Sequence, residues 1–278
     1  MNPPNTREGR GRGLGAPTAI AAAALSFGAA LVLLAALALP GFSELVQRGP
    51  LRVSVSGKIA PHSLPRNGAA PVAVSVGGKI SSTRPEGPPQ LRRITIGINR
   101  HGTLDSEGLP VCRVRQIQPS TDQQAFEACG PSLVGEGHFS ADIKIPSQSP
   151  FPSDGRIMAF NGRLGGKPAI LAHIYGAKPL PVSYVLPFVI HRGRGTFGTV
   201  LEASLPNVTG EWGFVKGVEM TLSRQFRFHG ERRSYLSAGC PAAEGFRSAF
   251  FDLAKTSFSF AGGATLTSLL SRRCTVSH

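Results

Sequence analysis

The sequence VKGVEMTLSRQFRF, residues 215–228, contains the longest run of alternating side chains in this chain. Met220, Leu222 and Phe226 fall on one face of an extended backbone, because successive side chains of a strand point to opposite sides. The period is two rather than the 3.6 of a helix, so the stretch predicts one long strand. His229, Gly230 and Glu231 after Phe228 predict a turn that sends the chain back as a hairpin.

Shorter stretches with the same alternation occur on both sides of this strand. They span residues 51–59, 72–80, 91–98, 139–145, 156–160, 169–175, 184–190, 199–205, 250–260 and 264–270. The chain holds 34 Gly and 23 Pro residues, which supply turns between these stretches. About a dozen short strands separated by turns predict an all-β fold, a β-sandwich of the Ig-like or jelly-roll-like kind. Pro187 predicts an edge position or a bulge for the strand that contains it.

One short helix is expected inside this β-domain, over Thr121–Cys129. Thr121 and Gln124 have the spacing of a capping box, in which each side chain binds the backbone of the other residue. Gly130 and Pro131 follow and end the helix.

An uninterrupted apolar segment precedes the β-domain. Residues 19–39, AIAAAALSFGAALVLLAALAL, carry no charge. As a helix they span about 31 Å, enough to cross the apolar core of a bilayer. Three arginines against one glutamate precede the segment, which favours a cytoplasmic N-terminus and an exported body. The segment is a transmembrane anchor or a cleaved signal peptide, since small residues at 36–38 and 41–43 suit cleavage.

The chain therefore divides into four parts: a basic cytoplasmic region 1–18, a signal peptide or anchor 19–41, a linker 42–50 and a β-sandwich domain 51–278. The Pro- and Ser-rich segment 147–154 leaves open a division of that domain into two lobes, 51–148 and 149–278. We expect the domain at the extracellular face of the cell membrane or secreted.

The chain is strongly basic, with a net charge of +14. Without the three arginines and one glutamate of residues 1–43, the exported body still carries +12. This charge favours an anionic partner, such as a wall polymer or lipid head groups, although it also serves general solubility.

Four cysteines, at positions 112, 129, 240 and 274, suggest disulfides in an exported chain. Of the three possible connectivities we predict Cys112–Cys129 and Cys240–Cys274, because each pair brackets a compact local stretch. A zinc site is the alternative, but no pair has C-x-x-C spacing and no His follows at ligand spacing.

Five stretches carry a resemblance to a known group of proteins. They are LRRITIGINRHGTLDSEGLPVC, GTFGTVLEASLP, WGFVKGVEMTLSR, RRSYLSAGCPA and SFSFAGGATLTSLLSRRC. Together they resemble an uncharacterised family of exported all-β proteins from GC-rich Gram-positive bacteria. The resemblance covers Leu51 to Cys274. It implies export and structural cysteine pairs, and it implies no activity and no cofactor.

No catalytic motif is complete in this sequence. GRGTFGTV, residues 193–200, matches the glycine-rich loop of protein kinases, but the catalytic and metal-binding motifs of a kinase are missing, so a hairpin is expected there. The seven histidines are scattered, and His173 is expected to pack in the sheet. The carboxylate pairs Glu136 with Asp142 and Glu202 with Glu219 could meet across strands, but they suit charge partners of arginine better. We predict no catalytic, cofactor-binding or metal-binding residue.

The best candidate for a binding surface is the hairpin RQFRFHGERR, residues 224–233. Its four arginines, Arg224, Arg227, Arg232 and Arg233, make a candidate anion-binding site, because arginine binds phosphate with two hydrogen bonds. The hairpin phenylalanines are expected in the core, which disfavours base stacking with nucleic acid. The sequence thus favours a non-enzymatic envelope or interaction module. The alternative is a hydrolase of cell-wall or environmental polymers that uses carboxylates on a face of the sandwich.

Overall fold

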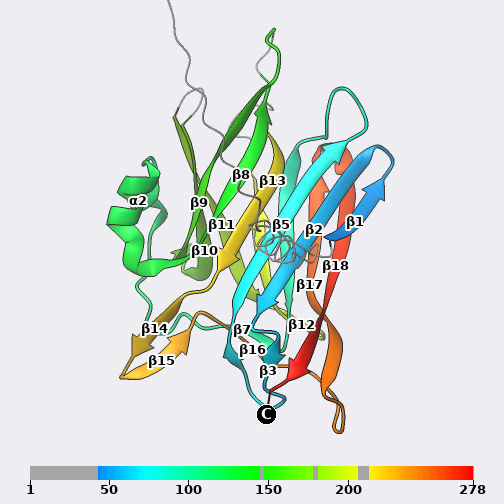
Figure 1. Ribbon diagram of the computed structural model, residues 1–278. Helices are drawn as coiled ribbons and strands as arrows, with labels where there is room; N and C mark the ends of the chain where they lie inside the picture. Colours follow the sequence, from blue (N-terminus) through cyan, green and yellow to red (C-terminus); the bar gives the residue numbers. More distant parts are fainter. Residues whose placement is uncertain (1–42, 145–146, 178–180, 206–212, 278) are drawn as a thin grey trace, which may run out of the picture. The chain divides into compact units, whose positions relative to one another are not determined.

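The computed structural model describes residues 43–144, 147–177, 181–205 and 213–277. Strands dominate them (Figure 1), as the alternating sequence predicts. The strands are β1 Ser43–Arg48, β2 Leu51–Ala60, β3 Ser63–Leu64, β4 Ala70–Pro71, β5 Ala73–Ser82, β6 Leu91–Asn99, β7 Gly102–Leu104, β8 Leu133–Ile143, β9 Phe151–Leu164, β10 Lys167–Gly176, β11 Val182–Arg192, β12 Phe197–Ser204, β13 Gly213–Leu222, β14 Gln225–Phe228, β15 Glu231–Ser234, β16 Leu236–Ala238, β17 Ser248–Phe260 and β18 Thr265–Val276. The helices are α1 Val114–Ile117 and α2 Asp122–Cys129, with 3₁₀ turns at Gly130–Ser132 and Ala261–Gly263.

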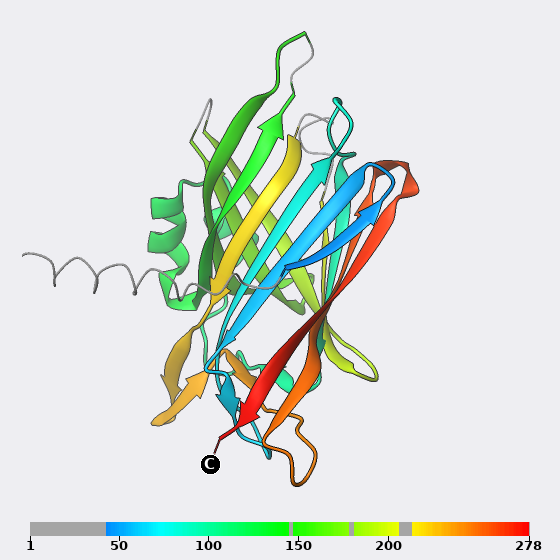
Figure 2. The ribbon, with the colours of Figure 1, turned by 45° about the vertical axis from the view of Figure 1, so that its right-hand side comes forward.

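Thirteen of these strands form one sheet, in the order β1-β2-β5-β13-β8-β9-β10-β11-β12-β6-β17-β18-β3. The sheet curls until β1 lies beside β18, as Figures 1 and 2 show. The prediction of an all-β fold is confirmed. Hydrogen bonding is continuous along this sheet, whereas the sandwich that we expected stacks separate sheets. Its opposite walls still pack face to face: Val53 and Ile80 of β2 and β5 meet Phe258 of β17 in one core cluster.

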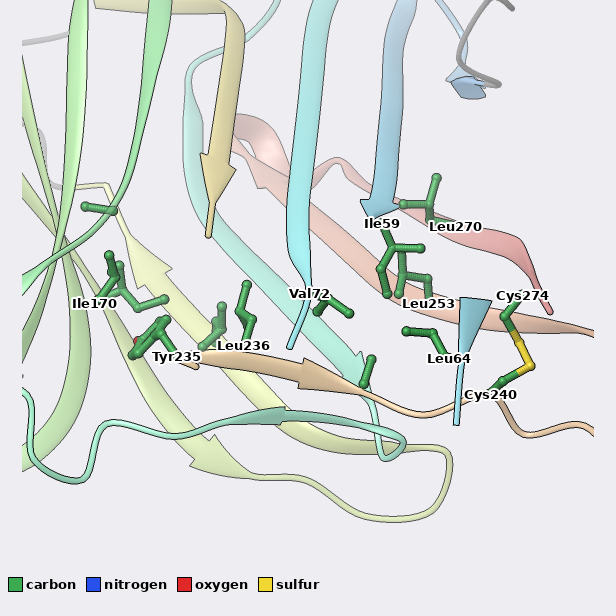
Figure 3. Packing of buried hydrophobic residues seen from close by; sticks show 14 of the residues in the cluster. Ile59, Leu64, Val72, Ile170, Tyr235, Leu236, Cys240, Leu253, Leu270 and Cys274 are labelled. Carbon is green, nitrogen blue, oxygen red and sulfur yellow. A yellow bond between two sulfur atoms is a disulfide. The ribbon is translucent and has the colours of Figure 1, made fainter. Parts of the chain in front are cut away.

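The main core lies where the curled sheet, which ends at β3, meets a separate small sheet of β4, β16 and β7. Tyr235 is completely buried in this cluster, next to Ile170 and Leu236 (Figure 3). The disulfide between Cys240 and Cys274 belongs to the same cluster, and neither cysteine is exposed to solvent. The segment 235–240 therefore passes through the core and is tied there to β18.

A second cluster lies on the outer face of β9, β10 and β11. The segment with α1 and α2 covers that face, and Ile117 and Ala125 pack onto Phe160 and Leu171 of the sheet. The predicted capping box is confirmed: Thr121 accepts a hydrogen bond from the backbone N–H of Gln124, whose side chain accepts one from Thr121 N–H. The helix ends at Cys129, as its sequence predicts.

Three expectations about the strands need correction or refinement. The long strand predicted over 215–228 is two strands, because the chain leaves the large sheet between β13 and β14. The expected linker 42–50 contains β1, whose six residues pair with β2. The second half of the candidate boundary 147–154 belongs to β9, because residues 151–154 pair with residues 140–143 of β8. The described residues from 43 to 277 belong to one compact unit of the chain.

Pro187 shows how a proline fits inside this sheet. β11 pairs with β10 along 182–189, where Pro187 lies opposite Leu171. On its other side β11 pairs with β12 only from Val189 to Arg192. At Pro187, β11 therefore has a ladder partner on the β10 side only, which is locally the edge position that its sequence predicts.

The apolar segment 19–39 lies outside the described residues, so its helix stays a prediction. Within the described ranges, no helix has both the length and the apolar character needed to cross a membrane.

Candidate functional site

The predicted hairpin forms from β14 and β15, joined by His229 and Gly230. Both turn residues have positive φ, 49° and 82°. This backbone matches the right-handed twist of a two-residue hairpin, and it fixes the register of the two strands. Arg227 consequently lies directly opposite Arg232.

Arg227 and Arg232 are both exposed on the same face of the hairpin. They line a depression of about 300 Å³ together with Gln225 and Phe226. Opposed residues of an antiparallel pair have Cβ atoms about 4.5–5.5 Å apart, so the two guanidinium groups can reach a common ligand. Neither arginine forms an ion pair with an acidic side chain of the described residues.

Arg233 lies on the opposite face of the hairpin and is already bound by two carboxylates. Its Nη1 lies 2.7 Å from Glu107 Oε2 and 3.4 Å from Asp105 Oδ2. The hydrogen bond to Glu107 raises the pKa of Arg233, so the group stays charged. The same guanidinium lies 5.2 Å from the ring centre of Phe228. Arg233 therefore attaches the hairpin to the loop after β7, and its charge is compensated inside the protein.

Gly108 allows this loop to approach the hairpin. Its φ is +85°, and a Cβ placed there would lie 2.3 Å from the Phe228 ring. Only a residue without a side chain fits such a contact.

Arg224 is half-buried at the start of the hairpin. Its Nη2 donates a hydrogen bond of 3.4 Å to the carbonyl oxygen of Pro131, and its own carbonyl oxygen accepts one from Tyr235 N–H. The four candidate arginines thus separate into two pairs. Arg227 and Arg232 face solvent together, whereas Arg224 and Arg233 contact the protein.

The carboxylates of the alternative hydrolase hypothesis are not brought together. Glu136 and Asp142 are six residues apart on β8, and each has a basic partner, Arg156 and Lys216 respectively. Glu202 of β12 forms an ion pair with Arg93. Its neighbour Ala203 packs in one cluster with Val218 and Met220, the neighbours of Glu219, so by strand alternation the two carboxylates point away from that cluster on opposite walls.

A larger depression, of about 480 Å³, lies between the loop after β7 and the turn joining β9 to β10. Asp105, Glu107 and Arg163 are among its lining residues. Two carboxylates here resemble a general acid and base pair, but Arg233 binds both and supplies their countercharge. We interpret the two carboxylates as the attachment point of the hairpin.

His173 is buried beneath the segment that carries α1 and α2. Its Nε2 lies 3.1 Å from the carbonyl oxygen of Ser120 and 3.3 Å from the hydroxyls of Ser120 and Ser183. The neighbouring hydroxyls suggest nucleophilic catalysis, but the side chain of His173 is 0 % exposed and the Ser120 hydroxyl donates to Ile117 O. Its Nδ1 has no partner in the described part of the chain. His173 therefore fits the packed role expected from its sequence.

The burial of His173 predicts a loss of stability in mild acid. Burial lowers the pKa of His173, against smaller raising effects of the Ser120 carbonyl and Asp122. The unfolded state takes up its proton near pH 6.5, above the folded pKa, so stability falls as pH drops through this window. The loss amounts to up to about 1.4 kcal/mol per pH unit over which folded His173 stays neutral.

The measurement is urea unfolding at pH 7.5 and pH 5.0 for the parent and for His173→Gln. The difference between the two pH values should shrink in the variant, because glutamine does not titrate. An unchanged difference would assign the acid sensitivity to other groups.

The four cysteines form the two predicted disulfides, Cys112–Cys129 and Cys240–Cys274. The zinc alternative is wrong for these residues, since all four are paired. Elsewhere in the described ranges, no cluster of three or more His, Cys, Asp or Glu side chains could hold a metal ion.

The kinase-like stretch 193–200 connects β11 to β12 as a hairpin, as expected. Its turn contains Gly195 at φ +65°. Sequence reasoning found the hairpin arginines but missed Asp105 and Glu107 as partners of Arg233. They lie more than 120 positions away in the chain, and no local pattern connects them.

No protein-family model, curated protein or solved structure matches this chain.

Proposed function

We propose that this protein is an exported, non-enzymatic module of the cell envelope, secreted or tethered to the membrane, that binds an anionic polymer through Arg227 and Arg232. The observation that supports this most is the cross-strand position of these two exposed arginines. Their depression also contains the Gln225 amide, which can donate further hydrogen bonds.

The energetics of the pair favour an anionic ligand. Like charges directly opposite each other destabilise a hairpin. No described acid forms an ion pair with either arginine, so no ion pair in that part of the chain offsets the repulsion. A phosphate or carboxylate between the guanidinium groups relieves it, and each group can offer two parallel N–H donors. Phosphate-bearing wall polymers repeat such groups along a chain, which suits a shallow and open depression.

The two disulfides support export, because such bonds persist in oxidising compartments and are rare in the cytosol. The curled sheet gives the hairpin a rigid base, since its opposite walls pack in the manner of a sandwich.

The test is a salt titration of binding to inorganic polyphosphate as the probe. Changing Arg227 and Arg232 together to alanine should weaken binding by at least about tenfold at low salt. The slope of log affinity against log salt should become shallower by about two, because each lost phosphate contact retains about one counterion.

A matched control removes two exposed arginines from another hairpin tip. Arg192→Ala with Arg194→Ala changes the net charge equally, but Arg192 ends β11 and Arg194 lies in the turn before β12. It should leave the affinity nearly unchanged. Equal losses in both double variants would show that the protein binds by net charge alone and would refute the hairpin site.

A further inference from the structure

Two phenylalanines near the start of β17 are unusually exposed. The side chains of Phe250 and Phe246 are 78 % and 66 % exposed, the highest values among the large apolar side chains of the described residues. Exposed apolar surface of this kind marks a contact site when it is grouped and bordered by polar residues.

Basic residues border both phenylalanines. Phe250 lies directly opposite Arg273 of β18, and Arg247 follows Phe246 in the chain. Both arginines are exposed, and neither forms an ion pair with a described acid. Arg273 makes only a 3.3 Å hydrogen bond to the Ser248 hydroxyl among the described contacts. The exposed acid nearby is Glu244, in the preceding turn.

The described part of the chain begins at Ser43 of β1, and β1 contacts β18, the strand of Arg273. Arg272, which precedes Arg273 and faces the other side of β18, forms an ion pair of 3.5 Å with Glu44 of β1. Residue 39, the last of the apolar segment, precedes Ser43 by four residues. A fully extended chain of that length spans at most about 14 Å. The β-domain therefore cannot lie far from a membrane that holds the segment.

We propose that the patch of Phe246, Arg247, Phe250 and Arg273 rests on an anionic phospholipid surface. The aromatic rings enter the interfacial layer, where apolar groups leave water, and the guanidinium groups bind lipid phosphates. The inference rests on the membrane tether of the proposed function but not on the Arg227 and Arg232 site.

The test uses the full chain, reconstituted in vesicles of phosphatidylglycerol and phosphatidylcholine. The single tryptophan, Trp212, is first changed to phenylalanine, and Phe250→Trp then supplies the probe. Its emission should shift to shorter wavelength and should be quenched by lipids brominated near the head group. Adding Arg247→Ala and Arg273→Ala, or omitting phosphatidylglycerol, should reduce both effects.

Leu45→Trp is the matched control. Leu45 is 63 % exposed and lies on β1, nearer in sequence to the apolar segment, but outside the patch. Its emission should stay at long wavelength without quenching. Equal quenching at both positions would show proximity through the tether alone and would overturn the proposal. A blue shift of Phe250→Trp without bromine quenching would indicate contact with a second copy and would also overturn it.

Flotation of the vesicles distinguishes failure of the membrane tether from failure of the docked patch. A chain that does not float with the vesicles would refute both the tether and the docked patch. A chain that floats without quenching of Phe250→Trp would refute the patch and leave the tether and the hairpin site intact.

Discussion

Replacing Cys240 and Cys274 together by alanine is expected to lower the free energy of unfolding by about 4 kcal/mol. The bond closes a loop with a sequence separation of 34 residues, and in the chain-entropy model the loss of this restraint on the unfolded state accounts for that amount. The loss should be visible because both cysteines are buried in the main core.

The measurement is equilibrium unfolding in urea, with Cys112→Ala and Cys129→Ala as the comparison. That bond closes a loop of 17 residues, and the same model gives about 3 kcal/mol. Native protein should also contain no thiol that reacts with a thiol reagent. An equal or larger loss for the shorter loop would contradict the chain-entropy reasoning, and two reactive thiols in native protein would contradict the disulfide itself.

Tyr235→Ala is expected to cost about 3–5 kcal/mol of stability, whereas Tyr235→Phe should change it by less than about 1 kcal/mol. The tyrosine ring is completely buried among Ile170, Leu236 and their neighbours, so its removal leaves a large cavity. Its hydroxyl is different. It is buried without a hydrogen-bond partner among the described residues, and burial raises the pKa of Tyr235.

The two variants separate the ring from the hydroxyl. Phenylalanine keeps the packing and removes a polar group whose desolvation is not compensated, so the change should be neutral or slightly stabilising. Both are measured by urea unfolding at pH 7.5. A cost above about 2 kcal/mol for Tyr235→Phe would show that the hydroxyl is hydrogen-bonded in solution, for example to a buried water.

Local patterns predicted the parts of this fold that depend on neighbouring residues. Alternation identified the strands because one face of each strand packs against a core. The capping box over Thr121 and Gln124 formed because both partners lie within one helical turn. The hairpin and its arginines followed from the sequence, but its turn was predicted over three residues, with Glu231 included. Only the structure shows a two-residue turn at His229 and Gly230, which places Arg227 opposite Arg232.

The remaining features depend on distant parts of the chain. Alternation of buried and exposed residues continues through Ser223 and Arg224, so the period could not show that β13 and β14 belong to different sheets. At the break the chain changes partners: Ser223 N–H binds the carbonyl oxygen of Val134, next to β13 and β8, whereas the Arg224 carbonyl oxygen accepts from Tyr235 N–H in the hairpin. The role of Arg233 also depends on residues that are distant in the sequence. Only the fold shows that Asp105 and Glu107 compensate its charge, which reduces the candidate site from four arginines to two.

The position of β1 at the edge of the curled sheet has a mechanical consequence. Its six residues form ladder hydrogen bonds with β2 on one side only, whereas β2 is also held by β5. A force that reaches Ser43 from the N-terminal side therefore acts first on a strand with a ladder on one side only. Peeling β1 away would release about 20 Å of extended chain and would leave the β2–β5 ladder intact. β1 would therefore extend under tension before the force reaches the core.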